Sequence, residues 1–353
     1  MSRATSLSLP LPLRPIRSVL RLGRLVPPGV ATSASRFCPV NSDGEHIAPE
    51  MLAAGSATRL LPGGGMGGAN AAKARRNLEV NAGISAEKTP PLAVVEDLLI
   101  EPGSSGAPVP ATRYRAEVTS TGLVVFFHGG GFALGSRATH DAYGRRLALD
   151  TGADVLSVEY RLAPEHPFPA ALDDAIAAWR FAVAMAPQWG VATDRLVVAG
   201  DSAGGNLATV LAHHLRSEAV TPCLQLLIYP VTDMTRTGGS REEFATGHFL
   251  TAERIEWFAQ CYIPAGVERG DPRISPLFAA DLTGMPPAHV VVAGFDPLRD
   301  EGIAYNDELG AAGVATTLQR ESGLIHGFAN MLGFSPTARQ AVSRMHEAVR
   351  RVL

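Results

Sequence analysis

Arg-Leu-Val-Val-Ala-Gly-Asp-Ser-Ala-Gly-Gly-Asn, residues 195–206, is the stretch that decides the fold. Its apolar run, residues 196–199, predicts a buried strand, and residues 206–216 predict a helix. The turn between them matches G-x-S-x-G, a pattern that marks a nucleophile elbow when it joins a strand to a helix through a sharp turn. We therefore expect Ser202 to be a nucleophile. The alternative is a chance match in a glycine-rich chain.

Composition limits the classes of protein to which the chain can belong. Of its 353 residues, 46% are hydrophobic and 18% are charged, which is enough apolar sequence for a large core. The net charge of −3 argues against nucleic acid as a partner, because no basic surplus can neutralise phosphates. The three cysteines, Cys38, Cys223 and Cys261, lie far apart and predict neither a zinc site nor a disulfide framework.

The N-terminal region differs from the rest of the chain. Residues 1–42 contain no acidic residue and six arginines, a composition typical of targeting segments, but several prolines interrupt any apolar signal core. We interpret residues 1–45 as a disordered or targeting extension. The sequence has no apolar run of about 18 residues, so no membrane span is expected. A reducing, cytoplasmic setting is the expectation unless residues 1–42 direct the chain elsewhere.

From about Leu92 onward, predicted strands and helices alternate. Strands are predicted at residues 93–100, 114–118, 123–127, 154–160, 224–229, 289–294 and 316–320, and helices at 171–185, 301–312 and 338–352. This alternation predicts an α/β fold, in which helices cover both faces of a mostly parallel sheet. We assign residues 91–353 to this domain.

Two regions depart from the alternation. Residues 46–90 predict only short helices, at 46–52 and 71–80, separated by the glycine-rich run 63–68. Residues 232–276 contain no predicted strand, and a helix is expected to begin after Thr251, whose side chain suits an N-cap. An excursion of this size between two core strands is typical of a lid.

A serine hydroxyl needs a base and an orienting acid to act as a nucleophile, and in open α/β sheets such groups follow the carboxyl ends of strands. Asp296 directly follows a predicted strand and is the candidate acid, although the residue could instead cap a helix. Asp300, one turn later, is the alternative acid. His326 lies in a loop after the last predicted strand and is the candidate base. Ser202, Asp296 and His326 occur in the order expected of an α/β-hydrolase.

The glycine-rich stretch His128–Phe132 directly follows the predicted strand 123–127. Stretches of this type supply backbone N–H groups to a tetrahedral intermediate, and the N–H of Ala203 can face the same charge from the start of its helix. His128 is an alternative base, but its place before the serine and beside the glycines favours a structural role. His289, inside a strand, and His346, on the polar side of the last helix, are further alternatives.

These motifs together resemble those of the hormone-sensitive-lipase-like esterases (bacterial family IV) of the α/β-hydrolase superfamily, from about Ile47 to the C-terminus. The segments that carry the resemblance are His128–Gly131, Tyr160–Pro169, Gly200–Gly204, Asp296–Asp300 and His326–Phe328. Within Tyr160–Pro169, we expect the prolines to shape a turn and Glu165 to pair locally.

The resemblance implies an α/β-hydrolase fold with Ser202, Asp296 and His326 as its catalytic triad and no cofactor or metal. It also implies an oxyanion hole made by the N–H groups of Gly130, Gly131 and Ala203. A helical cap would be built from residues 46–90 and the insertion at about 232–276. The extended N-terminus is longer than is usual in the family.

The expected activity is hydrolysis of short- to medium-chain acyl esters, with a small-molecule ester as the partner and a monomer or homodimer as the assembly. Amidase, lactonase or deacetylase activity with the same triad is an alternative. A non-catalytic, receptor-like binding protein is another alternative, but such proteins lack a triad member and His326 is present. The residues considered for an acyl pocket are Phe132, Phe244, Phe249 and Trp257, each of which could instead be plain core.

Overall fold

Within the described residues, the central sheet has eight strands in the order β1-β2-β4-β3-β5-β6-β7-β8, and β2 runs in the direction opposite to that of the other strands. The computed structural model describes residues 35–52, 70–101, 107–247 and 249–353. The strands are β1 (Val94–Ile100), β2 (Val109–Arg115), β3 (Leu123–Phe127), β4 (Asp154–Val158), β5 (Leu196–Asp201), β6 (Leu224–Ile228), β7 (Ala288–Phe295) and β8 (Thr316–Ile325).

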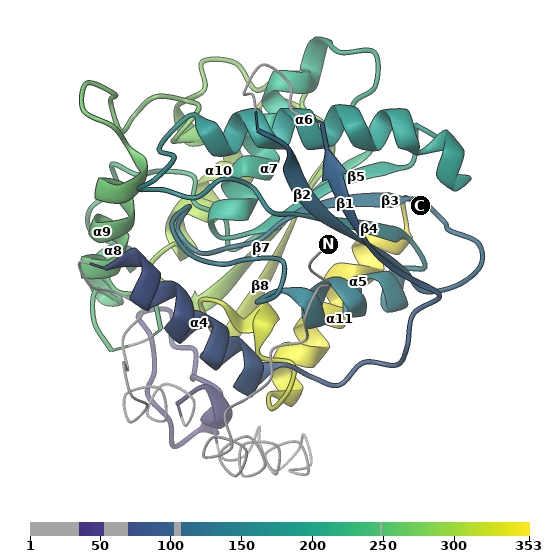
Figure 1. Cartoon of the computed structure of the whole chain (residues 1–353). Coiled ribbons are helices and arrows are strands. Elements are labelled where there is room, and N and C mark those ends of the chain that lie inside the picture. Colours follow the sequence, from purple (N-terminus) through teal and green to yellow (C-terminus); the bar gives the residue numbers. More distant parts are fainter. Residues whose placement is uncertain (1–34, 53–69, 102–106, 248) are drawn as a thin grey trace.

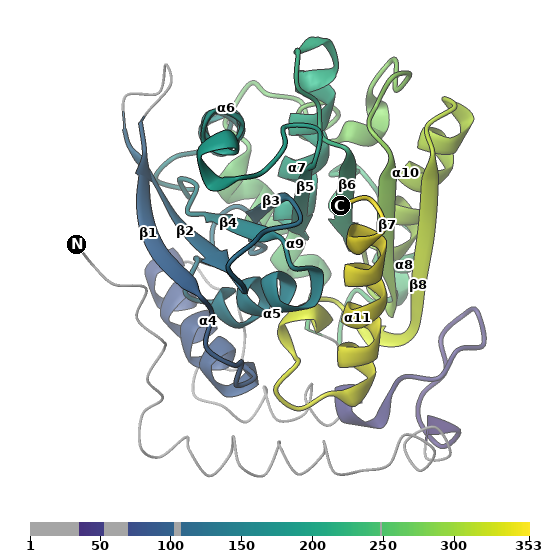
Figure 2. The ribbon, with the colours of Figure 1, turned by 90° about the vertical axis from the view of Figure 1, so that its right-hand side faces the viewer.

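Helices cover both faces of the sheet, as the alternation predicted (Figures 1 and 2). The α-helices are α4 (Ala71–Ser85), α5 (Asp141–Thr151), α6 (Ala170–Met185), α7 (Ala203–His214), α8 (Ser240–Glu243), α9 (Ala252–Tyr262), α10 (Arg299–Ala311) and α11 (Pro336–Arg350). Short 3₁₀ turns are η3 (Pro187–Trp189), η4 (Leu215–Ser217), η5 (Pro276–Phe278) and η6 (Phe328–Asn330). Helices α6, α7 and α10 pack on one face, and α5 and α11 pack on the other.

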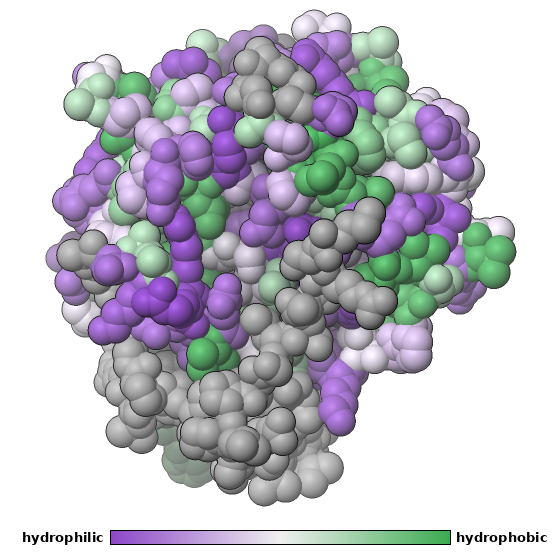
Figure 3. All heavy atoms as spheres, viewed as in Figure 1, coloured by the Kyte–Doolittle hydropathy of each residue, from purple (hydrophilic) through white to green (hydrophobic). Residues whose placement is uncertain are grey.

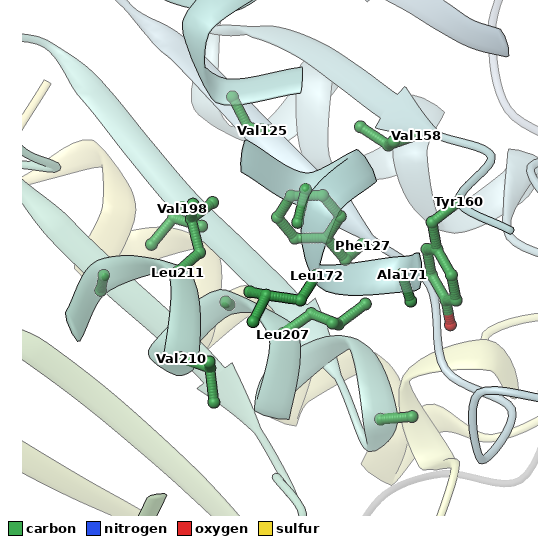
Figure 4. Packing of buried hydrophobic residues seen from close by; sticks show 14 of the residues in the cluster. Val125, Phe127, Val158, Tyr160, Ala171, Leu172, Val198, Leu207, Val210 and Leu211 are labelled. Atoms are coloured by element: carbon green, nitrogen blue, oxygen red, sulfur yellow. The ribbon is translucent and has the colours of Figure 1, made fainter. Parts of the chain in front are cut away.

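Strand β3 is a continuous apolar run whose side chains are buried on both faces of the sheet. Val125 and Phe127 belong to the core under α6 and α7, which Figure 4 shows with Leu207 and Leu211 of α7. The intervening side chains, such as Phe126, belong to the core under α5 and α11. Because successive side chains of a strand point to opposite faces, a strand buried on both faces is apolar throughout.

The predicted elements match the structure closely, with some shifts at their ends. Strand 123–127 is confirmed without change, but the strand predicted at 114–118 is β2 and begins at Val109. This strand begins earlier in the sequence than predicted, because residues 111–114 must pair with β4 as well as with β1. Helix α7 begins at Ala203 instead of residue 206, since the elbow at Ser202 leads directly into the helix. Helices α5 and α8 had no counterpart in the prediction.

Helices α4, α8 and α9 gather on one side of the molecule in Figure 1 and belong to the two regions proposed as the cap. Helix α9 begins where expected, because Thr251 caps it by accepting a hydrogen bond from the Arg254 N–H. Helix α4 spans the predicted residues 71–80 and continues to Ser85. Residues 49–52 are helical, whereas the proposed extension up to residue 34 and the glycine-rich run 63–68 lie outside the described residues.

The expectation that Glu165 pairs locally is wrong. Its carboxylate pairs with Arg75 of α4, 90 positions earlier in the chain, at 2.6 Å. The same guanidinium donates to the carbonyl oxygens of Ala133 and Ala163, each at 2.9 Å. Arg75 therefore joins helix α4 to the loop that follows β3 and to the proline-rich turn, a long-range contact that spacing along the sequence cannot reveal.

Figure 3 shows hydrophilic and hydrophobic residues interspersed over the face that Figure 1 presents. Among the helices of the described part of the chain, none combines the length and apolar character needed to cross a membrane.

Candidate active site

Ser202 occupies the sharp turn between β5 and α7, and its backbone is strained. Its φ of 56° and ψ of −117° lie in a region that L-residues rarely adopt. The turn closes tightly because Gly200 and Gly204 have no side chains. A Cβ on Gly200 would lie 2.2 Å from the Gly204 backbone, and one on Gly204 would lie 2.0 Å from the Phe127 carbonyl oxygen. The two glycines of the motif are therefore a steric requirement of the elbow.

Asp296 and His326 meet at Ser202, although 30 residues separate them in the chain. Asp296 directly follows β7, His326 directly follows β8, and both side chains are buried. His326 Nδ1 lies 2.7 Å from Asp296 Oδ2, and Nε2 lies 3.0 Å from Ser202 Oγ. Since a carboxylate can only accept, Nδ1 donates to Asp296 and leaves Nε2 free to accept the serine proton. The other oxygen of Asp296 accepts from the Leu298 N–H at 2.8 Å.

The alternative acid and bases have other partners. Asp300 accepts from the Ser240 N–H at 2.8 Å and pairs with Arg299. His289 hydrogen-bonds with Thr317 and Gln319 on β8. His346 was expected on the polar side of the last helix, but its side chain is fully buried, with Nδ1 2.8 Å from Asp150. A polar residue can lie on the buried side of a helix when a partner satisfies it, which explains this error.

The loop after β3 presents backbone N–H groups beside the serine. Gly130 and Gly131 have φ values of 129° and 59°, and the Leu134 N–H donates to the Gly130 carbonyl oxygen at 2.8 Å to close the turn. Within the described residues, the N–H groups of Gly130, Gly131 and Ala203 have no protein acceptor. Gly130, Gly131 and Ser202 all border the same cavity. Unpaired amides beside a nucleophile suit the stabilisation of a developing negative charge.

Asp201, which the sequence reasoning did not single out, links this loop to the elbow. Its buried carboxylate accepts from the Gly129 N–H at 2.7 Å and lies 3.2 Å from His140 Nε2. Burial alone would raise the pKa of Asp201, but His140 and the Gly129 amide outweigh it and lower the pKa below its ordinary value. Its place inside the G-x-S-x-G motif was the only available signal, because its partners come from distant segments.

His128 is a structural residue at the base of the loop. Its Nδ1 donates to the Gly129 carbonyl oxygen at 2.9 Å, and its ring stacks on Tyr160 with 4.3 Å between centroids. Burial lowers the pKa of His128 from 6.5 to about 4, so the ring is neutral at neutral pH. It contacts neither Ser202 nor Asp296 through a hydrogen bond, which agrees with the structural role favoured from the sequence.

The lowered pKa of His128 predicts a loss of stability in mild acid. An unfolded chain protonates this histidine as the pH falls below 6.5, whereas the folded protein resists protonation down to about pH 4. The free energy of unfolding should therefore fall over this window, with His128 contributing up to ~3 kcal/mol of the loss. We expect His128→Gln to weaken this pH dependence, measured by urea unfolding at several pH values. If the free energy of unfolding depended equally on pH in the two proteins, the loss of stability could not be assigned to His128.

The cavity over Ser202 is bordered mainly by apolar side chains from the sheet loops, α4 and the insertion after β6. Of the four residues considered for an acyl pocket, Phe132 and Phe249 border it. Phe244 and Trp257 do not. Phe244 instead packs on Phe295, and Trp257 packs against Phe258. The side chains that take their place are Leu78, Met234, Leu250, Ile255, Phe258 and Met331.

The described ranges contain no group of three His, Cys, Asp or Glu side chains placed to hold a metal ion. Within those ranges, Cys38, Cys223 and Cys261 are not joined in disulfides. A serine hydroxyl, an imidazole, a carboxylate and unpaired backbone amides gather at Ser202, and this combination of groups suits acyl transfer.

Comparison with known proteins gives consistent matches. A family model described as the alpha/beta hydrolase fold matches residues 124–330. The carboxylic ester hydrolase LipN of Mycobacterium tuberculosis is 39% identical over 346 residues, covering 94% of this chain and 91% of the relative. An ethyl acetate hydrolase of Pseudomonas putida is 38% identical, covering 84% of this chain and 94% of the relative.

Solved structures show the same relationship. The ester hydrolase EH1AB1 from the metagenome of Lake Arreo, complexed with a derivative of bipyridine phosphonate, superposes with a TM-score of 0.81 at 38% identity. The match covers 86% of this chain and 98% of that structure.

Proposed function

Because the chain belongs to the α/β-hydrolase family, among the hormone-sensitive-lipase-like esterases, and is a carboxylic ester hydrolase, we propose that Ser202, Asp296 and His326 are its catalytic triad. The observation that carries the proposal is the position of His326, whose two ring nitrogens lie 3.0 Å from Ser202 Oγ and 2.7 Å from Asp296 Oδ2. Each member of the triad then has the partner that its role requires.

In the proposed acylation step, Ser202 Oγ attacks the ester carbonyl carbon while His326 Nε2 takes the hydroxyl proton. Asp296 holds the imidazole by its Nδ1–H and stabilises the imidazolium that forms. The tetrahedral intermediate collapses with cleavage of the bond to the leaving oxygen, and His326 gives its proton to that alcohol. The acyl group remains on Ser202 as an ester.

In the proposed deacylation step, His326 removes a proton from water, which attacks the acyl-enzyme. The second tetrahedral intermediate collapses with cleavage of its bond to Ser202 Oγ, and His326 returns its proton to that oxygen. The products are the carboxylic acid and free Ser202. In both steps the N–H groups of Gly130, Gly131 and Ala203 would hold the oxyanion, and each such donor typically contributes ~2.7–4 kcal/mol. No protein acceptor competes for these three amides within the described segments, which supports the assignment.

We further propose that residues 46–90 and about 232–276 form a cap that limits the size of the substrate. Helix α4 supplies Leu78 and Ala82 to the cavity, and the insertion supplies Met234 and Phe258. Bulky side chains from both segments over the serine favour short- to medium-chain acyl groups. A relative named for hydrolysing ethyl acetate, an ester of a two-carbon acid, supports the same substrate class.

The acyl-length proposal predicts a peak in the rate profile of p-nitrophenyl esters. We expect kcat/KM to be greatest for acyl chains of roughly two to eight carbons and at least ten-fold lower for a sixteen-carbon chain. A ten-fold decrease corresponds to a transition state that binds about 1.4 kcal/mol less favourably, because the long chain fits the cavity poorly. Initial rates below the solubility limit of each ester provide the measurement. A preference for the longest chains would contradict the proposal while leaving the triad untouched.

A further inference from the structure

The wall of the cavity contains a buried arginine that the proposed mechanism does not use. Arg241 belongs to the short helix α8 in the insertion and borders the cavity together with Ser202 and His326. Only 8% of its side chain is exposed. The cavity residues nearest in sequence, Met234, Phe249 and Leu250, are apolar. A guanidinium in such surroundings is costly unless its N–H groups are satisfied.

Two of the three guanidinium nitrogens of Arg241 donate to acceptors in the protein. Nε and Nη2 donate to Glu301 Oε2 at 3.0 Å and 2.7 Å, and Nη2 also donates to the Asp233 carbonyl oxygen at 3.1 Å. Three donors on fixed partners lock the orientation of this planar group. Within the described ranges, the remaining nitrogen, Nη1, has no acceptor. Two N–H donors of a side chain that borders the cavity are thus left without a protein acceptor in the described ranges.

The charge of Arg241 is already balanced. Glu301 is fully buried, and its other oxygen accepts from the N–H groups of Thr232 and Asp233. Burial raises the pKa of Glu301 above its ordinary value, and the four surrounding donors favour its ionised form. A second carboxylate brought to Arg241 would add a negative charge beside Glu301. A neutral oxygen would satisfy Nη1 without that penalty.

We propose that Arg241 Nη1 is a specificity site for a neutral carbonyl oxygen in the substrate, in addition to the ester that is cleaved. The favoured substrates are then diesters and keto esters in preference to simple alkyl esters, with acids carrying a free carboxylate disfavoured. The second carbonyl can lie in the acyl group or in the alcohol. This inference rests on the proposed esterase function of Ser202 and specifies its substrate class.

Matched substrates test the inference on the wild-type protein. The acyl series compares p-nitrophenyl hexanoate and heptanoate with their 4-oxo, 5-oxo and 6-oxo analogues, and with the p-nitrophenyl hemiester of glutaric acid. The alcohol series compares butyl butyrate with 3-oxobutyl butyrate. After spontaneous hydrolysis is subtracted, we expect at least one oxo ester to exceed its alkyl match about ten-fold in kcat/KM, and the hemiester to fall below its match. An absence of preference in both series overturns the inference, and so does a preference for the hemiester.

A double substitution assigns the preference to Arg241. Arg241→Gln with Glu301→Gln removes the guanidinium without leaving a buried charge unpaired, and we expect it to abolish the preference for the oxo ester. The matched control is Arg269→Gln with Glu256→Gln, which removes an exposed ion pair from the same insertion and should keep the preference. A preference that survives the Arg241 substitution contradicts the assignment, and a variant that does not fold leaves the wild-type comparison decisive.

Different results would contradict the catalytic role of Ser202 and the specificity site at Arg241. If the wild type hydrolyses alkyl esters and oxo esters equally well, and Ser202→Ala hydrolyses neither, the triad stands and the specificity site falls. If Ser202→Ala hydrolyses both at the wild-type rate, the proposed function itself is contradicted.

Discussion

A His326→Ala variant is expected to hydrolyse p-nitrophenyl butyrate roughly a million times more slowly than the wild type, because loss of the base leaves Ser202 Oγ without a proton acceptor. KM should change little, since the imidazole acts mainly in the transition state. Stopped assays over hours give the residual kcat, and circular dichroism checks the fold. Asp296→Asn should cost roughly ten-thousand-fold, because an amide no longer selects the productive tautomer of His326.

His213 supplies the matched control for the histidine substitution. It lies at the end of α7, where Nε2 is 3.1 Å from the Asp281 carbonyl oxygen, and it borders no part of the cavity. His213→Ala should therefore keep wild-type kcat. A His326→Ala protein with more than about a thousandth of the wild-type kcat would show that another group serves as base, and the assignment of His326 would have to be abandoned.

Gly131→Ala is the second substitution with a large expected effect. Gly131 has a φ of 59°, and a Cβ there would lie 2.2 Å from the ring of Phe258. The loop must shift to relieve this clash, which displaces the amides proposed to hold the oxyanion. We expect kcat to fall roughly a hundred- to thousand-fold, the typical effect of losing one oxyanion donor. Adding Phe258→Ala removes the clash and should restore part of kcat.

Gly284→Ala separates backbone strain from the steric clash. Gly284 has a φ of 73°, but a Cβ there would meet nothing within 4 Å. This control should lose about 1 kcal/mol of stability and keep wild-type kcat, because a left-handed backbone disfavours alanine wherever it occurs. If Gly131→Ala behaves like the control, the loop after β3 has no part in holding the oxyanion.

The strands and the sharp turn around Ser202 could be predicted because they depend on residues that are close together in the sequence. An apolar run such as Leu123–Phe127 becomes a strand buried on both faces, and glycines are required where a backbone turns as sharply as at Ser202. Asp296 and His326 could then be located by their positions just after strands, since parallel strands bring their carboxyl ends to one edge of the sheet.

The residues that the sequence did not reveal depend on contacts between distant segments. Asp201 is defined by Gly129 and His140, and Arg241 by Glu301, 60 positions away. No periodicity or motif encodes such pairs. The pocket aromatics show the same limit. Phe258 borders the cavity and its neighbour Trp257 does not, because the side of α9 that carries Phe258 packs against Gly131 in the loop after β3.

The central claim is that Ser202 forms a covalent bond with the acyl group. Its most direct test is labelling with a p-nitrophenyl alkylphosphonate, which forms a stable adduct with an activated serine and releases p-nitrophenol. We predict one phosphonyl group per chain by intact mass, located on Ser202 by peptide fragmentation, with loss of activity in proportion to labelling and no adduct on Ser202→Ala. Full loss of activity with the label on another residue, or with Ser202 unmodified, would contradict the account.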